Sequence, residues 1–274
     1  MRERLVCLVL LMFIFISLNA TVLATDFDAK TIINKMKEAL EPEVSCTRKV
    51  VFTLKNDRGQ VTSTWVAREG RKKLADGKRT LLVMLEPDEV KGTTLLMGEL
   101  NDKASVQWIY LPAMKRVMKV VSAMTYESFQ GTDFTYSDIG FINVQGTHKV
   151  LGVDEHLGSK AYKVETIPEM KWYYSRIITW ISTENFLPLE RDDYDVAGRL
   201  WKRQLFEDVT VINNIPTPLR VRMMDVQTKA STEYRVSEIC YGAPIADEVF
   251  EPKGLPNVLE VPFCPLPPME DSAK

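Results

Sequence analysis

Residues 108–138, WIYLPAMKRVMKVVSAMTYESFQGTDFTYSD, decide how this chain is interpreted. The segment begins as a strand pattern that stops at Leu111-Pro112 and continues as a methionine-rich basic run. It ends in an aromatic loop, residues 128–134 (SFQGTDF), which places two phenylalanines beside a glycine and holds no catalytic constellation. A loop of this composition is better suited to gripping an apolar ligand than to reacting with one.

The N-terminal residues have the order of a secretory signal peptide. Arg2 and Arg4 precede an apolar run at residues 5–18, and a small-residue ending follows before Thr25. The run is shorter than the ~20 residues that a membrane-spanning helix needs. Cys7 stands at the start of the run, whereas a lipid-attachment cysteine would follow it. We therefore expect residues 1–24 to be cleaved and the mature chain to be secreted without an anchor.

Charge and cysteine content limit the partners and the covalent links. The formal net charge is −2 at pH 7, so the chain lacks the global basic field that binds nucleic acid. Three cysteines remain after the expected cleavage, Cys46, Cys240 and Cys264, in a compartment that permits disulfides. Cys240 with Cys264 is the preferred pair, but the other pairings stay open, as does a role for all three as buried apolar residues.

The mature chain has the pattern of a single domain, residues 25–269, that is mainly β. Residues 26–40 place apolar side chains at helical spacing, and Glu41-Pro42 ends this helix. Short β-branched and aromatic runs then follow without βαβ alternation, so we expect an antiparallel sheet of about a dozen strands, strongly curved or closed. The expected strands are residues 49–54, 60–67, 80–85, 93–97, 106–111, 149–153, 161–166, 175–181, 187–194, 199–211, 219–225 and 233–239.

Two segments interrupt the strand series. The first is residues 112–146. The second is the proline-rich end of the chain from Gly242, which we expect to be extended and to wrap the body before residues 270–274 become disordered.

The patterns of known catalytic and metal sites are missing from the sequence. His148 and His156 both fall in the β region and show no zinc spacing. The acidic residues 190–195 lack the pattern of a calcium loop and are typical of a solvated strand leading into the turn at Gly198. No nucleophile elbow or phosphate loop is found. We expect no metal, no cofactor and no enzymatic activity, with an undetected carboxylate pair of a hydrolase as the remaining enzyme interpretation.

An apolar ligand site needs a concave surface of aliphatic, methionine and aromatic side chains. Leu95 and Met97 lie in one expected strand, and Trp108 and Tyr110 share a face of the next. Three methionines follow, interleaved with three basic residues that could meet a phosphate or an acidic partner: Met114, Met118 and Met124, with Lys115, Arg116 and Lys119. Composition alone supports equally well an ordinary methionine core beneath a solvated basic edge.

These residues also resemble a known family. The segments that carry the likeness are residues 87–93 (PDEVKGT), 108–112 (WIYLP), 128–134 with Tyr136 and Asp138, 174–176 (YSR), 187–189 (LPL) and 194–202. In order and spacing they resemble the outer-membrane lipoprotein-sorting proteins of the LolA-like superfamily, over essentially the whole mature chain. The most specific pattern is SFxGTDFxYxD; Gln130 and Thr132 stand where Met and Ser are more frequent in the family.

The resemblance implies a periplasmic, half-open antiparallel β-barrel whose mouth is plugged by helices and whose hydrophobic cavity shelters acyl chains. Residues 112–146 would supply the lid helices, and the loop at 128–134 would shape the rim. The expected cavity residues are Leu95, Met97, Trp108, Tyr110, Met118, Phe129 and Phe134. The expected docking residues are Lys115, Arg116 and Lys119.

We therefore expect a monomeric, non-enzymatic carrier of lipoprotein acyl chains or lipid toward the outer membrane. Its partners would be an inner-membrane transporter and an outer-membrane receptor, with no nucleic acid. The alternative is a periplasmic lipid sensor or adaptor that signals to a membrane transporter or regulator through the same three basic residues.

Overall fold

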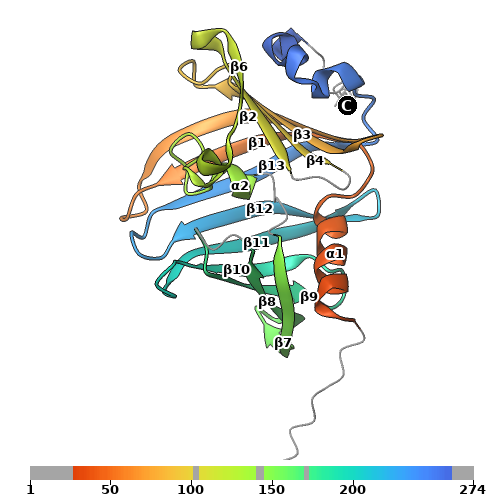
Figure 1. The fold of residues 1–274 in the computed structure, drawn as a ribbon, viewed down its shortest axis with the longest axis vertical. Coiled ribbons are helices and arrows are strands. Elements are labelled where there is room, and N and C mark those ends of the chain that lie inside the picture. Colours follow the sequence, from red (N-terminus) through yellow and green to blue (C-terminus); the bar gives the residue numbers. More distant parts are fainter. Residues whose placement is uncertain (1–26, 101–104, 140–144, 170–172, 261–274) are drawn as a thin grey trace, which may run out of the picture.

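The structure, a computed structural model, describes residues 27–100, 105–139, 145–169 and 173–260. Its strands form a 13-stranded antiparallel sheet that bends into an open half-barrel (Figure 1). In chain order the elements are α1 (Ala29–Leu40), β1 (Cys46–Lys55), β2 (Val61–Leu74), β3 (Gly77–Glu86), β4 (Thr94–Leu100), β5 (Val106–Leu111), η1 (Pro112–Met114), β6 (Arg116–Lys119), η2 (Ser122–Tyr126), α2 (Tyr136–Ile139), β7 (Gly146–His156), β8 (Ser159–Pro168), β9 (Arg176–Ser182), β10 (Pro188–Tyr194), β11 (Leu200–Ile212), β12 (Ile215–Asp225), β13 (Ser231–Tyr241), η3 (Asp247–Phe250) and η4 (Pro252–Glu260).

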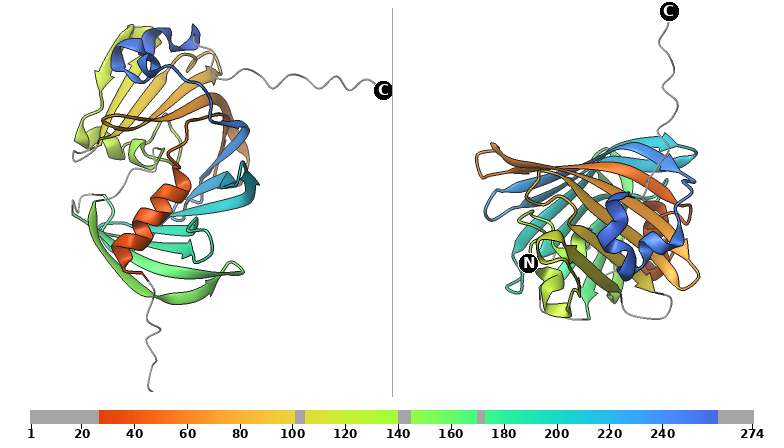
Figure 2. Two further views of the ribbon diagram at one scale, coloured as in Figure 1. Left: turned by 90° about the vertical axis from the view of Figure 1, so that its right-hand side faces the viewer. Right: turned by 90° about the horizontal axis from the view of Figure 1, so that it is seen from above.

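The strand order explains why one segment covers the open side of the sheet. β1 pairs with β13, so that two meanders, β1 to β6 and β7 to β13, meet in the middle of the sheet. The chain leaves the sheet at one edge, β6, and re-enters at the other edge, β7. The described part of this connection, residues 120–139, lies with α1 on the concave side, as Figure 2 shows.

The two faces of the sheet carry different apolar clusters. On β3, Leu82 and Met84 point to the concave cluster, whereas Leu81 and Val83 point to a second cluster on the opposite face. This alternation follows from the two-residue period of a strand. Both faces of β3 are therefore buried, as its continuous apolar run TLLVML indicates.

The concave cluster is the largest apolar region of the described chain, and side chains of β1 to β5 and β11 to β13 form its floor. Residues of the connection between β6 and β7, which lies on the concave side, cover this cluster. Its buried members are Val50, Phe52, Leu54, Trp65, Ala67, Leu82, Met84, Leu95, Met97, Ile109, Val120, Phe129, Phe134, Tyr136, Ile139, Phe206, Val221, Met223, Tyr234 and Val236.

The second cluster lies under the C-terminal segment, which packs on the convex side of β3 to β5 (Figure 2). Val249 and Phe250 of η3 and Leu255 and Val258 of η4 are buried there. The segment does wrap the body, but much of it is 3-10 helix rather than extended chain as expected.

Helix α1 begins three residues later than the sequence pattern indicates. Asp28 is the N-cap, and its side chain accepts a hydrogen bond from the backbone N–H of Thr31 at 2.7 Å. Ile32 and Ile33 are buried against Tyr162, Val164 and Ile181 of β8 and β9. The helix thus covers one half of the concave side, and residues 120–139 cover the other half.

The expected antiparallel sheet is confirmed, and each expected strand overlaps an observed one. The sheet is open, not closed, and β6 is a strand that the sequence did not predict. β2 runs to Leu74, well beyond the expected end at residue 67. The expected lid helices are wrong in form, because residues 112–139 contain β6, short 3-10 turns and the four-residue helix α2.

Candidate ligand-binding site

The expected lining residues divide between the two faces of the sheet. Leu95, Met97, Phe129 and Phe134 are buried in the concave cluster, and Met118 packs against it. Trp108 and Tyr110 pack instead in the convex cluster, under the C-terminal segment. The expectation that Trp108 and Tyr110 line the same cavity as Leu95 is therefore wrong. Ile109 is the residue of β5 that faces the concave cluster.

The loop at residues 128–134 folds back on itself through short-range hydrogen bonds. The backbone N–H of Phe129 donates to the carbonyl of Phe134 at 2.8 Å, and Ser128 Oγ donates to the carbonyl of Thr132 at 2.6 Å. Gln130 and Gly131 turn the chain with φ of 51° and 82°. A glycine tolerates this left-handed conformation without the strain of a Cβ. The loop therefore has a defined shape of its own.

The two phenylalanines of the loop fill the concave side rather than shape its rim. Phe129 is 1% exposed and Phe134 is 2% exposed. The Phe129 ring lies 6.2 Å from the Phe52 ring and 5.3 Å from the Tyr136 ring, and the Phe134 ring lies 6.4 Å from the Tyr234 ring. These spacings are those of packed aromatic pairs. In this structure the loop thus occupies the space that an apolar ligand would need.

Asp133 ties the loop to the floor of the half-barrel. Thr232 Oγ1 of β13 donates to Asp133 Oδ2 at 2.7 Å and accepts from the Asp133 backbone N–H at 3.0 Å. Lys202 Nζ of β11 donates to the Asp133 carbonyl at 2.5 Å. Burial raises the pKa of the Asp133 carboxyl, against the lowering effect of the Thr232 hydrogen bond. Its partners give Asp133 a structural role.

Asp138, four residues after the loop, makes a second link between this segment and the rest of the protein. Its Oδ2 accepts from the backbone N–H and the hydroxyl of Thr135, at 3.0 and 2.8 Å, and from Tyr174 Oη at 3.2 Å. Arg191 Nη2 of β10 lies 3.5 Å from Asp138 Oδ1. The Arg191 guanidinium also donates from Nε to Asp193 Oδ1 at 2.8 Å.

Asp193 is fully buried beneath this second link. Burial raises the pKa of its carboxyl to about 6, even though Arg191 lowers it. A buried carboxylate stays ionised only when cations and hydrogen bonds compensate it. The second link therefore depends on Arg191, which serves both Asp138 and Asp193.

A third polar group lies on the same concave face, near the end of α1. Glu69 of β2 is almost fully buried and pairs with Arg48 at 2.7 Å and Arg71 at 2.5 Å. Tyr234 Oη donates to the same carboxylate. Burial raises the pKa of Glu69, but the two arginines outweigh it and the net shift is downward. This group explains why β2 continues through a charged sequence.

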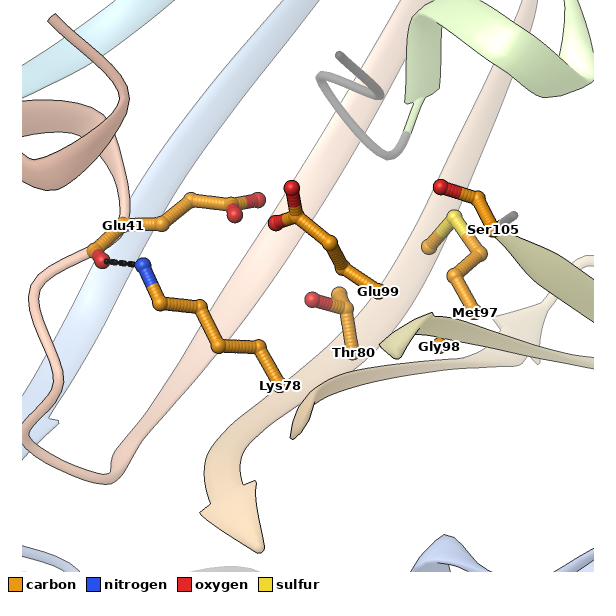
Figure 3. Close-up of a pocket in the computed structure, with 7 residues that line it drawn as sticks. All are labelled: Glu41, Lys78, Thr80, Met97, Gly98, Glu99 and Ser105. Atoms are coloured by element: carbon orange, nitrogen blue, oxygen red, sulfur yellow. Dashed lines mark hydrogen bonds between the residues drawn. The ribbon is translucent and has the colours of Figure 1, made fainter. Parts of the chain in front are cut away.

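A small pocket opens beside this end of α1, as Figure 3 shows. Lys78 Nζ crosses it to donate to the Glu41 carbonyl at 2.8 Å. Burial raises the pKa of the Glu41 carboxyl. The enclosed space of about 20 Å³ has room for water but not for an acyl chain. The lining residues are Glu41, Lys78, Thr80, Met97, Gly98, Glu99 and Ser105.

The expected docking residues lie together at the β6 edge of the sheet. Lys115, Arg116 and Lys119 are exposed, and none of them forms an ion pair with the described residues. Met114, in the turn that precedes β6, is 56% exposed. An unpaired strand edge flanked by basic residues resists uncontrolled strand addition. It also leaves an exposed basic surface for an acidic partner.

The acidic and histidine residues that suggested other chemistry have structural partners. Asp192 receives Nε and Nη2 of Arg203 at 2.7 and 2.8 Å, and Asp195 accepts the backbone N–H groups of the turn at Gly198. His156 lies 3.1 Å from Glu190. Within the described residues no group of three potential metal ligands is found. No described helix is long and apolar enough to cross a membrane.

Several residues of the site could not be recognised from the sequence as site residues. Phe52, Tyr234 and Met223 form the floor under the loop, and Lys202 and Arg191 hold its two links. Alternation within β1, β12 and β13 predicts a buried face for the first three. No local sequence pattern marks Lys202 and Arg191 as site residues.

Cys46 is buried without a disulfide. Cys264, the preferred partner of Cys240, and the signal peptide lie outside the described residues.

Three solved structures share this architecture. A domain assigned to outer membrane lipoprotein sorting, from Vibrio parahaemolyticus, is 26% identical at a TM-score of 0.75 and covers 82% of this chain and 97% of that chain. A DUF1329 family protein from Desulfovibrio piger ATCC 29098 is 23% identical at 0.74 and covers 83% and 99%. A LolA superfamily protein from Nitrosomonas europaea is 18% identical at 0.66 and covers 82% and 98%. The last two likenesses concern the fold alone.

Sequence comparison gives one further match. A family model described as "Uncharacterized protein" matches residues 76–257, about two thirds of the chain. The matched region runs from the start of β3 to η4 and includes the loop with both of its links. No curated protein matches the sequence.

Proposed function

We propose that this chain, which belongs to the family of the matching model and to the LolA-like superfamily of outer-membrane lipoprotein-sorting proteins, is a periplasmic carrier of acyl chains. The cargo would be a lipoprotein or a lipid, held on the concave face of the half-barrel for transfer toward the outer membrane. The proposal is for a binding protein without catalytic chemistry.

One observation carries the proposal: a concave apolar face is covered by a loop that polar contacts tie down. Phe129 and Phe134 are packed against the floor residues Phe52 and Tyr234 as an apolar ligand would be. Asp133 and Asp138 hold the loop through contacts that can be exchanged for water. The loop therefore acts as a lid that fills the site when no cargo is bound. Leu95, Met97 and Ile109 belong to the surface that would take over the acyl chain.

The free energy gained by burying an acyl chain is large enough to offset the free energy lost when the lid leaves the concave face. Burying one CH₂ group contributes ~0.8 kcal/mol, so an acyl chain of about sixteen carbons contributes on the order of 10 kcal/mol. Moving a phenylalanine side chain out costs roughly 1.5–3 kcal/mol, and each neutral hydrogen bond of the lid about 0.5–1.5 kcal/mol. The acyl chain gains more than the lid loses, but the difference is moderate, and a carrier must also release its cargo.

A pair of methionines near the β6 edge tests the proposal. Met118 packs against the concave cluster, whereas Met114 is exposed. We expect Met118→Asp to weaken binding of a fluorescent fatty acid roughly tenfold or more, because a carboxylate facing an acyl chain loses its hydration. Met114→Asp, the matched control, should bind like the wild type. Fluorescence titration measures both, and circular dichroism checks that both variants are folded.

Equal binding by the two variants would contradict a site on the concave face. A second measurement addresses the cargo directly. Native mass spectrometry of the full chain purified from its own periplasm should reveal a bound lipid or lipoprotein. Turnover of an ester substrate by the same preparation would instead support a hydrolase.

The exposed basic edge supports a role in docking to an inner-membrane transporter, and it is also the surface that the sensor or adaptor alternative would use. We expect Lys115→Glu, Arg116→Glu and Lys119→Glu together to abolish co-purification of such a transporter while leaving fatty-acid binding unchanged, because the change reverses the charge of this edge. The matched control reverses three exposed basic residues elsewhere, Lys30, Arg58 and Lys229. Equal co-purification by both triple variants would exclude this edge as the docking surface.

A further inference from the structure

Gln204 of β11 is a buried side chain whose hydrogen-bonding groups are not satisfied. It is 1% exposed, and neither its Nε2 nor its Oε1 has a hydrogen-bond partner in the described structure. Most buried amides in proteins are paired with protein groups or with ordered water. An amide with both groups unpaired loses hydration on each side. The described residues therefore leave Gln204 in need of a polar partner.

The position of Gln204 on the sheet defines where that partner would lie. Lys202, Gln204 and Phe206 are the buried, inward-facing residues of β11. Across the strand pairs, Gln204 stands opposite Arg191 of β10 on one side and Met223 of β12 on the other. Opposed side chains in a sheet have Cβ atoms about 4.5–5.5 Å apart, so these residues are direct neighbours.

Gln204 therefore marks a boundary on the concave face. On one side lie Phe206, Val221 and Met223, which belong to the apolar floor. On the other side lie Arg191 and Asp193, which belong to the second link of the lid. Asp193 Oδ2 is also buried without a partner. An amphiphilic ligand needs such a boundary, where its chain ends and its polar group begins.

We propose that Gln204 is the hydrogen-bonding subsite for the amide group of an amide-linked acyl chain. This inference rests on the proposed function, and it specifies the class of cargo. The acyl chain would lie on the floor formed by Phe206, Val221 and Met223. The Gln204 Oε1 would accept the ligand N–H, and the Gln204 Nε2 would donate to water, because the N–H and the carbonyl of a trans amide point in opposite directions.

The chemistry of Gln204 favours an amide over two other acyl ligands. An ester has acceptors but no N–H group, so it would leave Gln204 Oε1 unsatisfied. An ionised fatty acid likewise has acceptors but no N–H group, so it also leaves Gln204 Oε1 unsatisfied. An amide supplies the N–H donor that Gln204 Oε1 lacks, and neither of the other two ligands has one.

Two probes of equal length test the inference: N-methyldodecanamide and methyl dodecanoate. We expect the wild-type full chain to bind the amide roughly threefold to tenfold more tightly than the ester, which corresponds to one neutral hydrogen bond. Gln204→Met keeps a similar side-chain volume and removes both polar groups. It should bind the ester at least as well as the wild type does and show no preference for the amide. Isothermal titration calorimetry measures all four affinities.

Retained ester binding shows that the variant is folded, and Gln204→Leu provides a second apolar replacement. Equal affinity of the wild type for both probes would overturn the inference, because it would mean that Gln204 holds only water. A preference that persists in both variants would overturn it as well. If the wild type binds neither probe nor a fatty acid, the proposed carrier function itself fails, and this result is distinct from the other two.

Discussion

A disulfide between the lid and the floor should block acyl-chain loading, and reduction should restore it. The substitutions are Asp133→Cys and Thr232→Cys, at two side chains that now touch through a 2.7 Å hydrogen bond. Oxidation would replace an exchangeable contact with a covalent one. Since Phe129 and Phe134 fill the concave cluster, a lid that cannot leave would keep an acyl chain out of the site.

We expect the oxidised double variant to show no measurable binding of a fluorescent fatty acid, and the reduced form to bind it. The reduced form should bind at least as well as the wild type, because the hydrogen bond of the Asp133 carboxylate to Thr232 is lost. Thr232→Cys alone, treated with the same oxidant, is the matched control. Full binding by the oxidised double variant would show that cargo does not enter beneath this loop. The carrier proposal would then require another site.

The second large effect concerns Arg191, whose removal should strongly destabilise the fold. Arg191 is the cation shared by Asp138 and Asp193, two carboxylates that are almost completely buried. Breaking a buried ion pair by removing one partner typically costs about 3–5 kcal/mol. We therefore expect Arg191→Met to lower the free energy of unfolding by roughly 3 kcal/mol or more at pH 7.5. Urea unfolding followed by circular dichroism measures this change.

The loss should depend on pH, with a sign set by Asp193. Its pKa is raised from 3.8 to about 6 in the folded protein. The folded state thus prefers the protonated carboxyl, and the stability from this group, present below pH 3.8, disappears as the pH rises through about 6. Removing Arg191 raises the Asp193 pKa further, because the arginine lowers it. The variant should therefore lose most stability above pH 7 and least near pH 4.

Arg199→Met is the matched control for Arg191→Met. Arg199 pairs with Asp195 on the same hairpin, but its side chain is 71% exposed. An exposed pair contributes about 0–1 kcal/mol, so this variant should unfold almost like the wild type at each pH. A loss of the same size in both variants would indicate a general effect of the hairpin. A pH-independent loss in Arg191→Met would contradict the role of Asp193.

The sequence predicted most accurately those elements whose pattern is local. β5 has the expected bounds, because its apolar and aromatic run ends at a proline. The beginning of β2 was found within one residue, but its end was not. Residues 68–73 (REGRKK), of which all but Gly70 are charged, break the apolar alternation. The strand continues there because Glu69 pairs with Arg48 of β1 and Tyr234 of β13, and Arg71 pairs with Glu69 and donates to the carbonyl of Leu40 at the end of α1.

The resemblance to the LolA-like superfamily, whose most specific segment is residues 128–138, is also confirmed. The loop residues in this motif make their own turn, through Ser128, Gly131 and Thr132. Their spacing is therefore visible in the sequence. The ligand-binding role of the expected lining residues stays a prediction, as do the single-domain boundaries.

The faces of β4 and β5 show what a strand pattern leaves open. Leu95 and Met97 alternate with Leu96, and Ile109 alternates with Trp108 and Tyr110, but alternation alone does not say which set faces the concave side. Trp108 was assigned to the concave side because an aromatic residue suits a ligand site. The C-terminal segment buries it on the other face instead, and this long-range contact has no signature near residue 108.

The sequence by itself determined the class of the sheet, the position of nearly every strand and the self-contained turn of the loop, because hydrophobic period and turn chemistry act over a few residues. Only the tertiary structure decided that the loop fills the concave side. The edges β6 and β7 lie at opposite ends of the sheet. The chain that joins them must therefore cross its open side, where Arg191 and Lys202 hold it to strands more than fifty residues away.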